Sequence, residues 1–270
     1  MEKVFSGKAT DSIQGIYRFS NKATYRFVNW YGLETAEGLT IIDAGFAGHW
    51  SQLVKWVKSL GRPLTDVKAV VLTHAHMDHM GFAERARQEA GAEIWVHTAD
   101  EGAALRGDPP PPALIQNLWR PTLLATVIPC ALFESAFKHD PPQQVNLYKD
   151  GDQLAVPGSP QIIHTPGHTP GHCAIHLPEV NVLFTGDEIC TLDIIRLKTT
   201  PPSVLMPGLN DDHAICFESL AVLENLGEVL MLPGHGKPWQ GDMGDAVSIA
   251  REMGNAVANI KAVERESPRR

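Results

Sequence analysis

The sequence predicts an α/β protein, because short apolar strands alternate with amphipathic helical segments along most of its 270 residues. Hydrophobic residues make up 43% of the chain and charged residues 20%, with 23 glycines and 20 prolines. This balance is that of a folded globular protein, and it excludes a collagen-like, coiled-coil or wholly disordered chain. The length exceeds that of an average domain but is within the range of one large layered α/β unit.

The first sixty residues predict strands followed by a helix. Aromatic and β-branched runs at 15–19, 25–31 and 39–43 are separated by turn residues, which is typical of a strand meander. Residues 49–60 then carry apolar side chains at helical spacing, and Gly61 is suited to the left-handed conformation that ends a helix.

The alternation continues through the rest of the chain. A continuous apolar strand at 67–72 leads directly into a histidine-rich segment, so these histidines follow the carboxyl end of a strand. A helix at 79–90, a strand at 93–97 and a helix at 98–105 come next. For the second half we expect strands at 153–156, 161–164, 173–177, 182–185 and 228–232, and helices at 212–226 and 245–263.

Residues 107–142 break this pattern and are interpreted as a helical insertion. Four consecutive prolines at 109–112 form a stiff spacer, and mostly apolar, helix-like residues follow. The segment could close over the functional site as a lid, form a dimer face or pack as added core. Trp119, Phe133 and Phe137 are the residues with which to test these alternatives.

Charge and composition indicate which partners and compartment to expect. The net charge of −8 and the pI near 5.8 disfavour nucleic acid, whose binding needs a clustered basic face. The partner that we expect, from the family resemblance given below, is a small-molecule substrate. The sequence has neither the apolar run of a secretory signal nor that of a membrane span, and its four cysteines lack C-x-x-C spacing. We therefore expect a cytoplasmic protein with free thiols that does not bind membranes, and a homodimer is an open alternative to the monomer.

The segment His74-Ala75-His76-Met77-Asp78-His79 places three imidazoles and one carboxylate within six residues. Alternate residues of an extended loop point the same way, so His74 and His76 can bind one cation. Asp78 and His79, at the start of the next helix, can turn toward a second. Imidazole and carboxylate are ligands of divalent ions such as zinc, and the spacing predicts two adjacent metal sites.

Three more candidate ligands stand at sharp turns that follow apolar strands. They are His168 in Thr-Pro-Gly-His-Thr, Asp187 in Phe-Thr-Gly-Asp and His235 in Leu-Pro-Gly-His-Gly. In each case the preceding glycine allows the backbone to turn tightly beside a crowded cation, while the strand fixes where the ligand projects.

This series of motifs, H-x-H-x-D-H followed by a distant His, a Gly-Asp and a distant Gly-His, resembles the metallo-β-lactamase fold superfamily. The resemblance extends from about residue 15 to residue 239. It implies a four-layer αβ/βα sandwich of two mixed β-sheets flanked by helices, in a single domain over residues 1–270, with the metal ions at one edge of the sheets. It also gives Asp43 the look of the aspartate that supports the ligands from a strand end.

Carried over position by position, the resemblance implies two divalent metal ions. Zinc is the expected ion, with iron or manganese as alternatives. The implied ligands are His74, His76 and His168 for the first ion, Asp78, His79 and His235 for the second, and Asp187 as the bridge between them.

The expected function is that of a metal-dependent hydrolase. Two ions about 3.5–4 Å apart lower the pKa of a shared water toward about 7, so the nucleophile would be a metal-bridging hydroxide. It would open a carbonyl-containing bond such as a lactone, a thioester or a related ester or amide. Asp78 is the expected catalytic residue, which orients the hydroxide and passes its proton to the leaving group. No G-x-S-x-G motif is present, which disfavours a serine nucleophile.

The complete ligand set resembles those of the glyoxalase II and lactonase types, and two departures bear on the substrate. The last motif reads Gly-His-Gly-Lys rather than the Gly-His-Glu-Tyr of glyoxalase II, and Cys190 stands where the lactonases commonly place a tyrosine. The alternatives are a mononuclear iron oxidoreductase resembling the persulfide dioxygenases, and β-lactam hydrolysis as a minor activity.

Other polar residues are interpreted as structural. His172 enters a strand and is expected to be buried and hydrogen-bonded, and both His172 and His176 are expected to lie outside the metal site. Arg196 and Lys198 follow Asp187 and could meet a substrate carboxylate, although isolated basic residues are usually solvated. The remaining histidines lack partner spacing and are expected to be surface or packing residues; they are His49, His97, His139, His164 and His213.

Overall fold

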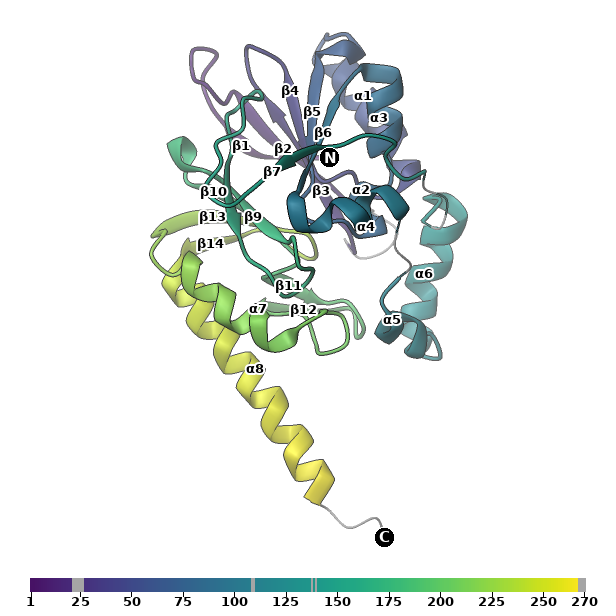
Figure 1. Cartoon of the computed structure of the whole chain (residues 1–270), viewed down its shortest axis with the longest axis vertical. Helices are drawn as coiled ribbons and strands as arrows, with labels where there is room; N and C mark the ends of the chain where they lie inside the picture. The colour runs from purple at the N-terminus through teal and green to yellow at the C-terminus, as the bar shows by residue number, and fades with distance from the viewer. Residues whose placement is uncertain (21–26, 108–109, 137, 139, 267–270) are drawn as a thin grey trace.

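Two β-sheets pack against each other and carry helices on their outer faces (Figure 1). The computed structural model of the chain describes residues 1–20, 27–107, 110–136, 138 and 140–266, with side chains as far as residue 254. The larger sheet contains, in spatial order, β1 (Glu2–Ser6), β2 (Gly15–Ser20), β3 (Asn29–Glu34), β4 (Leu39–Ile42), β5 (Val67–Val71), β6 (Glu93–His97) and β7 (Asn146–Tyr148). The smaller contains β14 (Trp239–Asp242), β13 (Glu228–Pro233), β10 (Val182–Gly186), β9 (Cys173–Leu177) and β8 (Gln161–His164).

A separate hairpin of β11 (Cys190–Asp193) and β12 (Lys198–Ser203) lies beside the smaller sheet (Figure 1). The α-helices are α1 (Trp50–Ser59), α2 (Met77–Met80), α3 (Ala83–Ala90), α4 (Glu101–Arg106), α5 (Pro112–Gln116), α6 (Pro121–Phe133), α7 (His213–Ser219) and α8 (Met243–Glu266). Short 3-10 helices occupy Ala47–His49, Leu64–Asp66, Thr98–Asp100, Pro178–Val180 and Leu220–Leu223.

The order of layers follows from side-chain alternation in the central strands. In β4, Ile41 packs outward against α1 and α3, whereas its neighbour Ile42 packs inward into the core that the two sheets share. Phe184 of β10 enters the same core from the smaller sheet and meets the ring of Tyr31. The outer face of the smaller sheet packs against α7 and α8. The predicted four-layer αβ/βα sandwich of two mixed sheets is therefore confirmed.

Parallel pairing decides which loops meet. The strands β4, β5, β6 and β7 run parallel in the larger sheet, and β10 pairs in parallel with β13 in the smaller one. Their carboxyl ends therefore lie at common edges, where the loops that follow them can bring side chains together.

Several predicted elements differ in detail from the observed ones. The helix expected at 79–90 is two helices, because the backbone of Gly81 and Phe82 donates hydrogen bonds to the carbonyls of Gly45 and Ala44 instead of continuing one helix. The strand expected at 153–156 is wrong. That segment forms only an isolated bridge between Gln153 and Gln161 within a tight turn.

Short edge strands were not predicted, since three to six residues carry little periodicity; they are β1, β7, β11, β12 and β14. The strand expected at 25–31 is described only from residue 27 onward, and there β3 begins at Asn29. The predicted helices at 98–105 and 212–226 each include a 3-10 turn.

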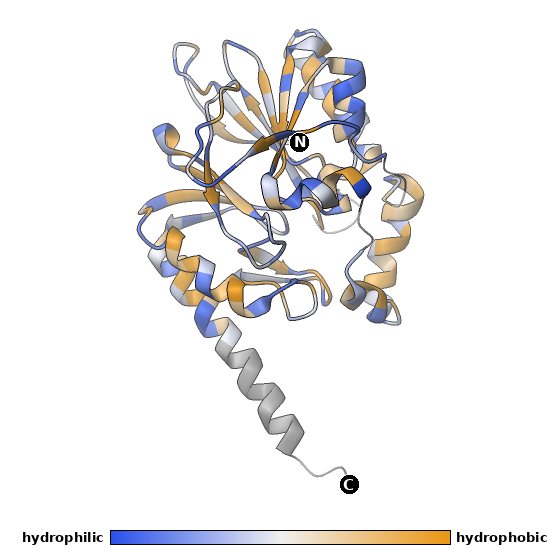
Figure 2. Ribbon diagram, in the orientation of Figure 1, coloured by the Kyte–Doolittle hydropathy of each residue, from blue (hydrophilic) through white to orange (hydrophobic). Residues whose placement is uncertain are grey.

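The segment at 107–142 contains α5 and α6, each with a proline at its first helical position, where the missing N–H costs nothing. Leu123, Thr126 and Cys130 form the buried face of α6. Figure 2 shows α6 as hydrophobic along much of its length. Trp119 and Phe133 are 72% and 79% exposed, so they lie on the outer surface of this segment, and Phe137 lies outside the described residues. In the described part of the chain, no helix has both the length and the apolar character needed to span a lipid bilayer.

Candidate metal centre

Seven side chains from four chain segments meet at the edge where the carboxyl ends of the central strands lie. His74 and His76 follow β5, and Asp78 and His79 belong to α2. The other three follow β8, β10 and β13, respectively: His168, Asp187 and His235. The structure brings all seven predicted ligands together in overlapping groups, in each of which the ligand atoms lie within 4.8 Å of one another.

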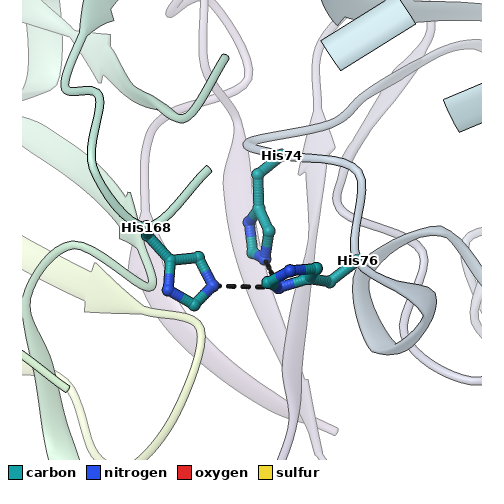
Figure 3. A group of neighbouring side chains, drawn as sticks. All are labelled: His74, His76 and His168. Carbon is teal, nitrogen blue, oxygen red and sulfur yellow. Dashed lines mark hydrogen bonds between the residues drawn. The ribbon is translucent and has the colours of Figure 1, made fainter. Parts of the chain in front are cut away.

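The first group consists of His74, His76 and His168, whose rings point toward one another (Figure 3). His76 Nδ1 lies 3.1 Å from His74 Nε2 and 2.9 Å from His168 Nε2. In a tetrahedral zinc site with nitrogens at 2.0–2.1 Å from the metal, ligand atoms are separated by about 3.3 Å. The three nitrogens are therefore spaced closely enough to bind one cation.

The second group consists of Asp78, His79 and His235. Asp78 Oδ2 lies 3.8 Å from His79 Nε2 and 3.7 Å from His235 Nε2. The three atoms come from α2 and from the loop after β13 and lie within 4.8 Å of one another, so this group can hold a second cation.

Asp187 stands between the two groups. Its Oδ2 lies 3.4 Å from His168 Nε2 and 3.0 Å from His235 Nε2, and its Oδ1 lies 3.4 Å from His79 Nε2. The carboxylate thus contacts the first group through His168 and the second through both of its histidines. The carboxylate can bridge a pair of ions, one in each group.

Hydrogen bonds at Nδ1 orient the imidazoles of both groups. The Nδ1–H of His79 donates to Asp43 Oδ2 at 2.8 Å, that of His168 donates to Asn210 Oδ1 at 2.9 Å, and that of His235 donates to the carbonyl of Phe27. Each bond is made at Nδ1, so Nε2 is the nitrogen that faces the centre and can bind a cation. Among the described residues the buried His79 Nε2 has no hydrogen-bond partner, and coordination to a metal ion would satisfy it.

The electrostatic environment differs between the groups. Burial lowers the pKa of His76 to about 3, with the neighbouring His168 acting in the same direction, so this ring is neutral and can donate its lone pair. Burial also lowers the pKa of His79, but the carboxylates of Asp187, Asp43 and Asp78 outweigh it and raise the pKa to about 10. A field that favours a proton at Nε2 also favours a metal cation there.

Asp100 supports the first group, although sequence reasoning did not identify it. Its buried carboxylate accepts from the backbone N–H of Ala75 at 3.1 Å, from Thr169 Oγ1 at 2.7 Å and from the N–H of Gly171 at 2.7 Å. It therefore joins the loop of His74 and His76 to the loop of His168. The available signal was its position just after β6, at the same edge of the sheet.

His172 supports the bridging carboxylate from outside the cluster. Its Nε2 accepts from the backbone N–H of Asp187 at 3.0 Å, and its Nδ1 contacts Thr165 Oγ1 at 2.9 Å. Gly186, with φ +48°, has no room for a side chain, because a Cβ would approach His172 Nε2 to 2.6 Å. As expected, His172 is buried and hydrogen-bonded, and so is part of the support rather than of the ligand groups.

Other residues singled out in the sequence lie elsewhere. Arg196 pairs with Asp193 at 3.0 Å in the β11–β12 hairpin and does not reach the cluster. Cys190 is buried, with Sγ 3.9 Å from Asp187 Oδ1, so its thiol lies beside the candidate bridging carboxylate. Outside the ligand groups are also His49, His97, His164, His176 and His213; His139 lies outside the described residues.

A pocket opens directly onto the cluster. Its floor includes five of the seven candidate ligands, and its walls are apolar and come from α5, α6 and the segments on either side of them, together with residues of the β11–β12 region. Leu114 and Val127 line it from α5 and α6, whereas Trp119 and Phe133 do not. The inner face of the 107–142 segment therefore forms one wall of the site.

Comparison with known proteins finds relatives that are named as hydrolases. The chain is 26% identical to the probable metallo-hydrolase YflN of Bacillus subtilis (strain 168), over 96% of this chain and 97% of that protein. It is 30% identical to the hydroxyacylglutathione hydrolase GloC of Haemophilus influenzae, over 54% of this chain and 59% of that protein.

Solved structures with a similar fold include a metallo-beta-lactamase family protein and a di-iron-bound protein. The metallo-beta-lactamase family protein TTHA1429 of Thermus thermophilus matches with a TM-score of 0.65 and 26% identity, over 92% of this chain and 81% of that one. TTHA1623 in a di-iron-bound form matches with a TM-score of 0.60 and 25% identity, over 87% of this chain and 98% of that one. Residues 23–235 match the sequence profile of the Metallo-beta-lactamase superfamily. The chain belongs to the metallo-β-lactamase superfamily.

Proposed function

We propose that the protein is a dinuclear metal-dependent hydrolase that opens a carbonyl-containing bond such as a lactone or a thioester. The observation that carries this proposal is the position of Asp187, whose two oxygens face histidines of both ligand groups. A carboxylate between two sets of lone pairs is suited to holding two cations close together. The similarity to a metallo-hydrolase and to a hydroxyacylglutathione hydrolase supports the reaction class.

The residues present fit a pair of divalent ions, and zinc is the ion we propose. Imidazole nitrogens and carboxylate oxygens are the donors of catalytic zinc sites, and the first group offers three donors, which leaves a further position open. When bound, such ions lower the pKa of water toward 7 and polarise a carbonyl oxygen. The di-iron form of TTHA1623 makes iron the main competing metal.

Asp78 is the residue we assign to proton handling. Its carboxylate lines the pocket and is 21% exposed, whereas the side chain of Asp187 is 3% exposed. Asp78 can therefore reach both a water held in the centre and the leaving group of a substrate in the pocket. A carboxylate so placed can accept the proton of the attacking water and return it to the leaving group.

The proposed compartment is the cytoplasm. All four cysteines are buried free thiols, which is the state expected of a protein from a reducing environment.

The test uses the full-length protein, a panel of lactones, thioesters and β-lactams, and an oxygen electrode. We expect hydrolysis that is lost after metal removal by a chelator and restored by zinc, with no oxygen consumed. Oxygen consumption with one bound iron per chain would instead favour the mononuclear oxidoreductase.

A further inference from the structure

We propose that the substrate is an uncharged ester, lactone or thioester whose acyl part is an apolar chain, and that this chain lies in the pocket against α5 and α6. The inference rests on the proposed function for the reacting bond and adds the chemical class of the group attached to it. It follows from the chemistry of the residues that line the pocket.

The pocket has two chemically distinct parts. Its floor carries His76, Asp78, His168, Asp187 and His235, where the reacting carbonyl would lie. The walls above the floor are hydrocarbon and include Phe27, Phe46, Leu114, Val127, Ile194 and Leu205. A substrate with its reactive carbonyl at one end and an apolar chain at the other matches this division, because each buried methylene gains transfer free energy from such walls.

The charges of the residues that line the pocket narrow the substrate class further. Of the described residues that line this pocket, the charged ones are Asp78 and Asp187, both on the floor, and no lysine or arginine is among them. A carboxylate on the distal end of a substrate would lose its hydration among apolar walls without gaining a cation in return. We therefore expect weak binding of glutathione thioesters, whose peptide part carries carboxylates.

A second pocket next to His76 has a mixed lining. Polar residues that include Asp100, Arg106, Gln116 and Asp211 alternate there with alanine, proline and glycine, and α5 contributes residues to its wall. His76 is the only one of the seven candidate ligands that borders it. The apolar pocket borders five of them, so it is the one positioned to hold the group attached to the reacting carbonyl.

The kinetic test uses the zinc-loaded full chain and esters of one leaving group. We expect kcat/KM to rise about fourfold per methylene from para-nitrophenyl acetate to the butanoate and hexanoate. The matched charged substrate is the para-nitrophenyl monoester of adipic acid, which has the same acyl length as the hexanoate but ends in a carboxylate. Its kcat/KM should be at least 100-fold lower. Equal values for the hexanoate and the adipate monoester, or a preference for the adipate, would overturn the proposal.

A binding measurement keeps this test independent of turnover. Isothermal titration should detect binding of N-phenylhexanamide to the loaded protein and no binding of its analogue with a terminal carboxylate. If no ester is hydrolysed but this difference is seen, the proposed function fails and the apolar pocket stands. If esters are hydrolysed but both amides bind equally, the pocket assignment fails and the hydrolase stands.

A pair of adjacent residues on α5 provides matched variants. Leu114 lines the pocket, whereas Ile115 is 55% exposed and belongs to the outer surface. We expect Leu114→Lys to lower kcat/KM for the hexanoate at least 10-fold and to raise it for the adipate monoester, because the new ammonium can pair with the carboxylate. Ile115→Lys should change both values less than twofold.

Thermal unfolding controls for folding in both variants. If Leu114→Lys does not fold, Leu114→Ala serves instead and should weaken the dependence on chain length. If a folded Leu114 variant kept the wild-type preference for the hexanoate over the shorter esters and the adipate monoester, Leu114 would not belong to the wall that contacts the acyl chain.

Discussion

Asp43 connects the second ligand group to the loop that carries the first. Its Oδ2 accepts from His79 Nδ1 at 2.8 Å, and its Oδ1 accepts from the N–H of Thr73 at 2.8 Å. The Thr73 hydroxyl lies 3.0 Å from both Asp43 and His74 Nδ1. One buried carboxylate therefore orients ligands of both groups.

Replacing Asp43 tests this supporting role. Asp43 has φ +59°, a conformation that asparagine tolerates well, so Asp43→Asn should fold. It removes the charge that holds His79 in its tautomer, and we expect the affinity for the second metal ion to fall about 10- to 100-fold. Metal titration monitored by calorimetry would measure this loss. If the variant bound the second metal ion as tightly as the wild type does, the supporting role of Asp43 would be contradicted.

Asp78 gives the sharpest test of the proposed chemistry. Asparagine keeps an oxygen donor but cannot accept a proton, so Asp78→Asn should lower kcat about 100-fold or more in the presence of excess metal. Metal content must be measured alongside, since only a variant with both ions separates proton handling from ligand loss. A fully loaded Asp78→Asn protein with unchanged kcat would show that another group moves the proton.

Single residues differ in how far the sequence predicts them. The seven candidate ligands could be singled out because they belong to motifs with fixed spacing next to apolar strands. Asp100 and Asn210 stand outside any such motif, and only the folded chain brings them to Thr169 and His168. Supporting residues of this kind depend on tertiary contacts that spacing along the chain does not encode.

At the scale of elements, Glu84 connects α3 to the end of the 107–142 segment. Its carboxylate accepts from Arg87 at 2.7 and 2.9 Å, and it also accepts from the backbone N–H of Gln143 at 3.2 Å. The hydrogen bonds from Arg87 lower the pKa of Glu84 to about 2, against the opposing effect of burial. The ionised carboxylate thus holds the backbone at Gln143, just after the 107–142 segment, against α3.

The pH dependence of this contribution follows from the lowered pKa. A carboxyl whose pKa falls from 4.5 in the unfolded chain to about 2 in the folded one stabilises the protein fully above pH 4.5, and this effect is lost as the pH falls toward 2. We expect Glu84→Gln to reduce the free energy of unfolding by about 1 kcal/mol at pH 7 and by progressively less below pH 4.5. Urea unfolding at several pH values would measure the difference.

Glu89 on the same helix provides the matched control. It pairs with Arg85 at the surface, where both side chains are about half exposed, so Glu89→Gln should change stability by less than about 0.5 kcal/mol at any pH. A similar loss for both variants, or a loss at Glu84 that does not vary with pH, would contradict the assigned pKa.

The predictability of elements depends on their length and burial. The helix α1 was predicted because its apolar residues recur at helical spacing over several turns. The central strands were predicted because each is a short, mainly apolar run. The break at Gly81 was missed, because it arises from hydrogen bonds to the carbonyls of Gly45 and Ala44, which are distant in sequence. The apolar residues of the segment at 153–156 suggested a strand, but Leu154 and Val156 pack into the core between the sheets from a turn.

At the scale of the whole molecule, the two sheets contribute different parts of one centre. The larger sheet supplies His74 and His76 through β5, and the smaller sheet supplies Asp187 and His235 through the parallel pair β10 and β13. The core between the sheets fixes the distance between these edges. The layered fold could be expected from family resemblance. For residues 107–142 the sequence offered a cover over the site as one of three alternatives, and the choice among them depends on how α5 and α6 pack onto the β11–β12 region.

The metal content of the full-length protein decides whether this geometry is a dinuclear site. Purified protein would be incubated with zinc, manganese or ferrous iron, dialysed, and analysed by plasma mass spectrometry. We predict two equivalents of divalent metal per chain in the wild type and one in His235→Ala, with the first group still occupied. No more than one equivalent in the wild type with any of these metals would contradict the paired-ion centre and the hydrolytic chemistry that depends on it.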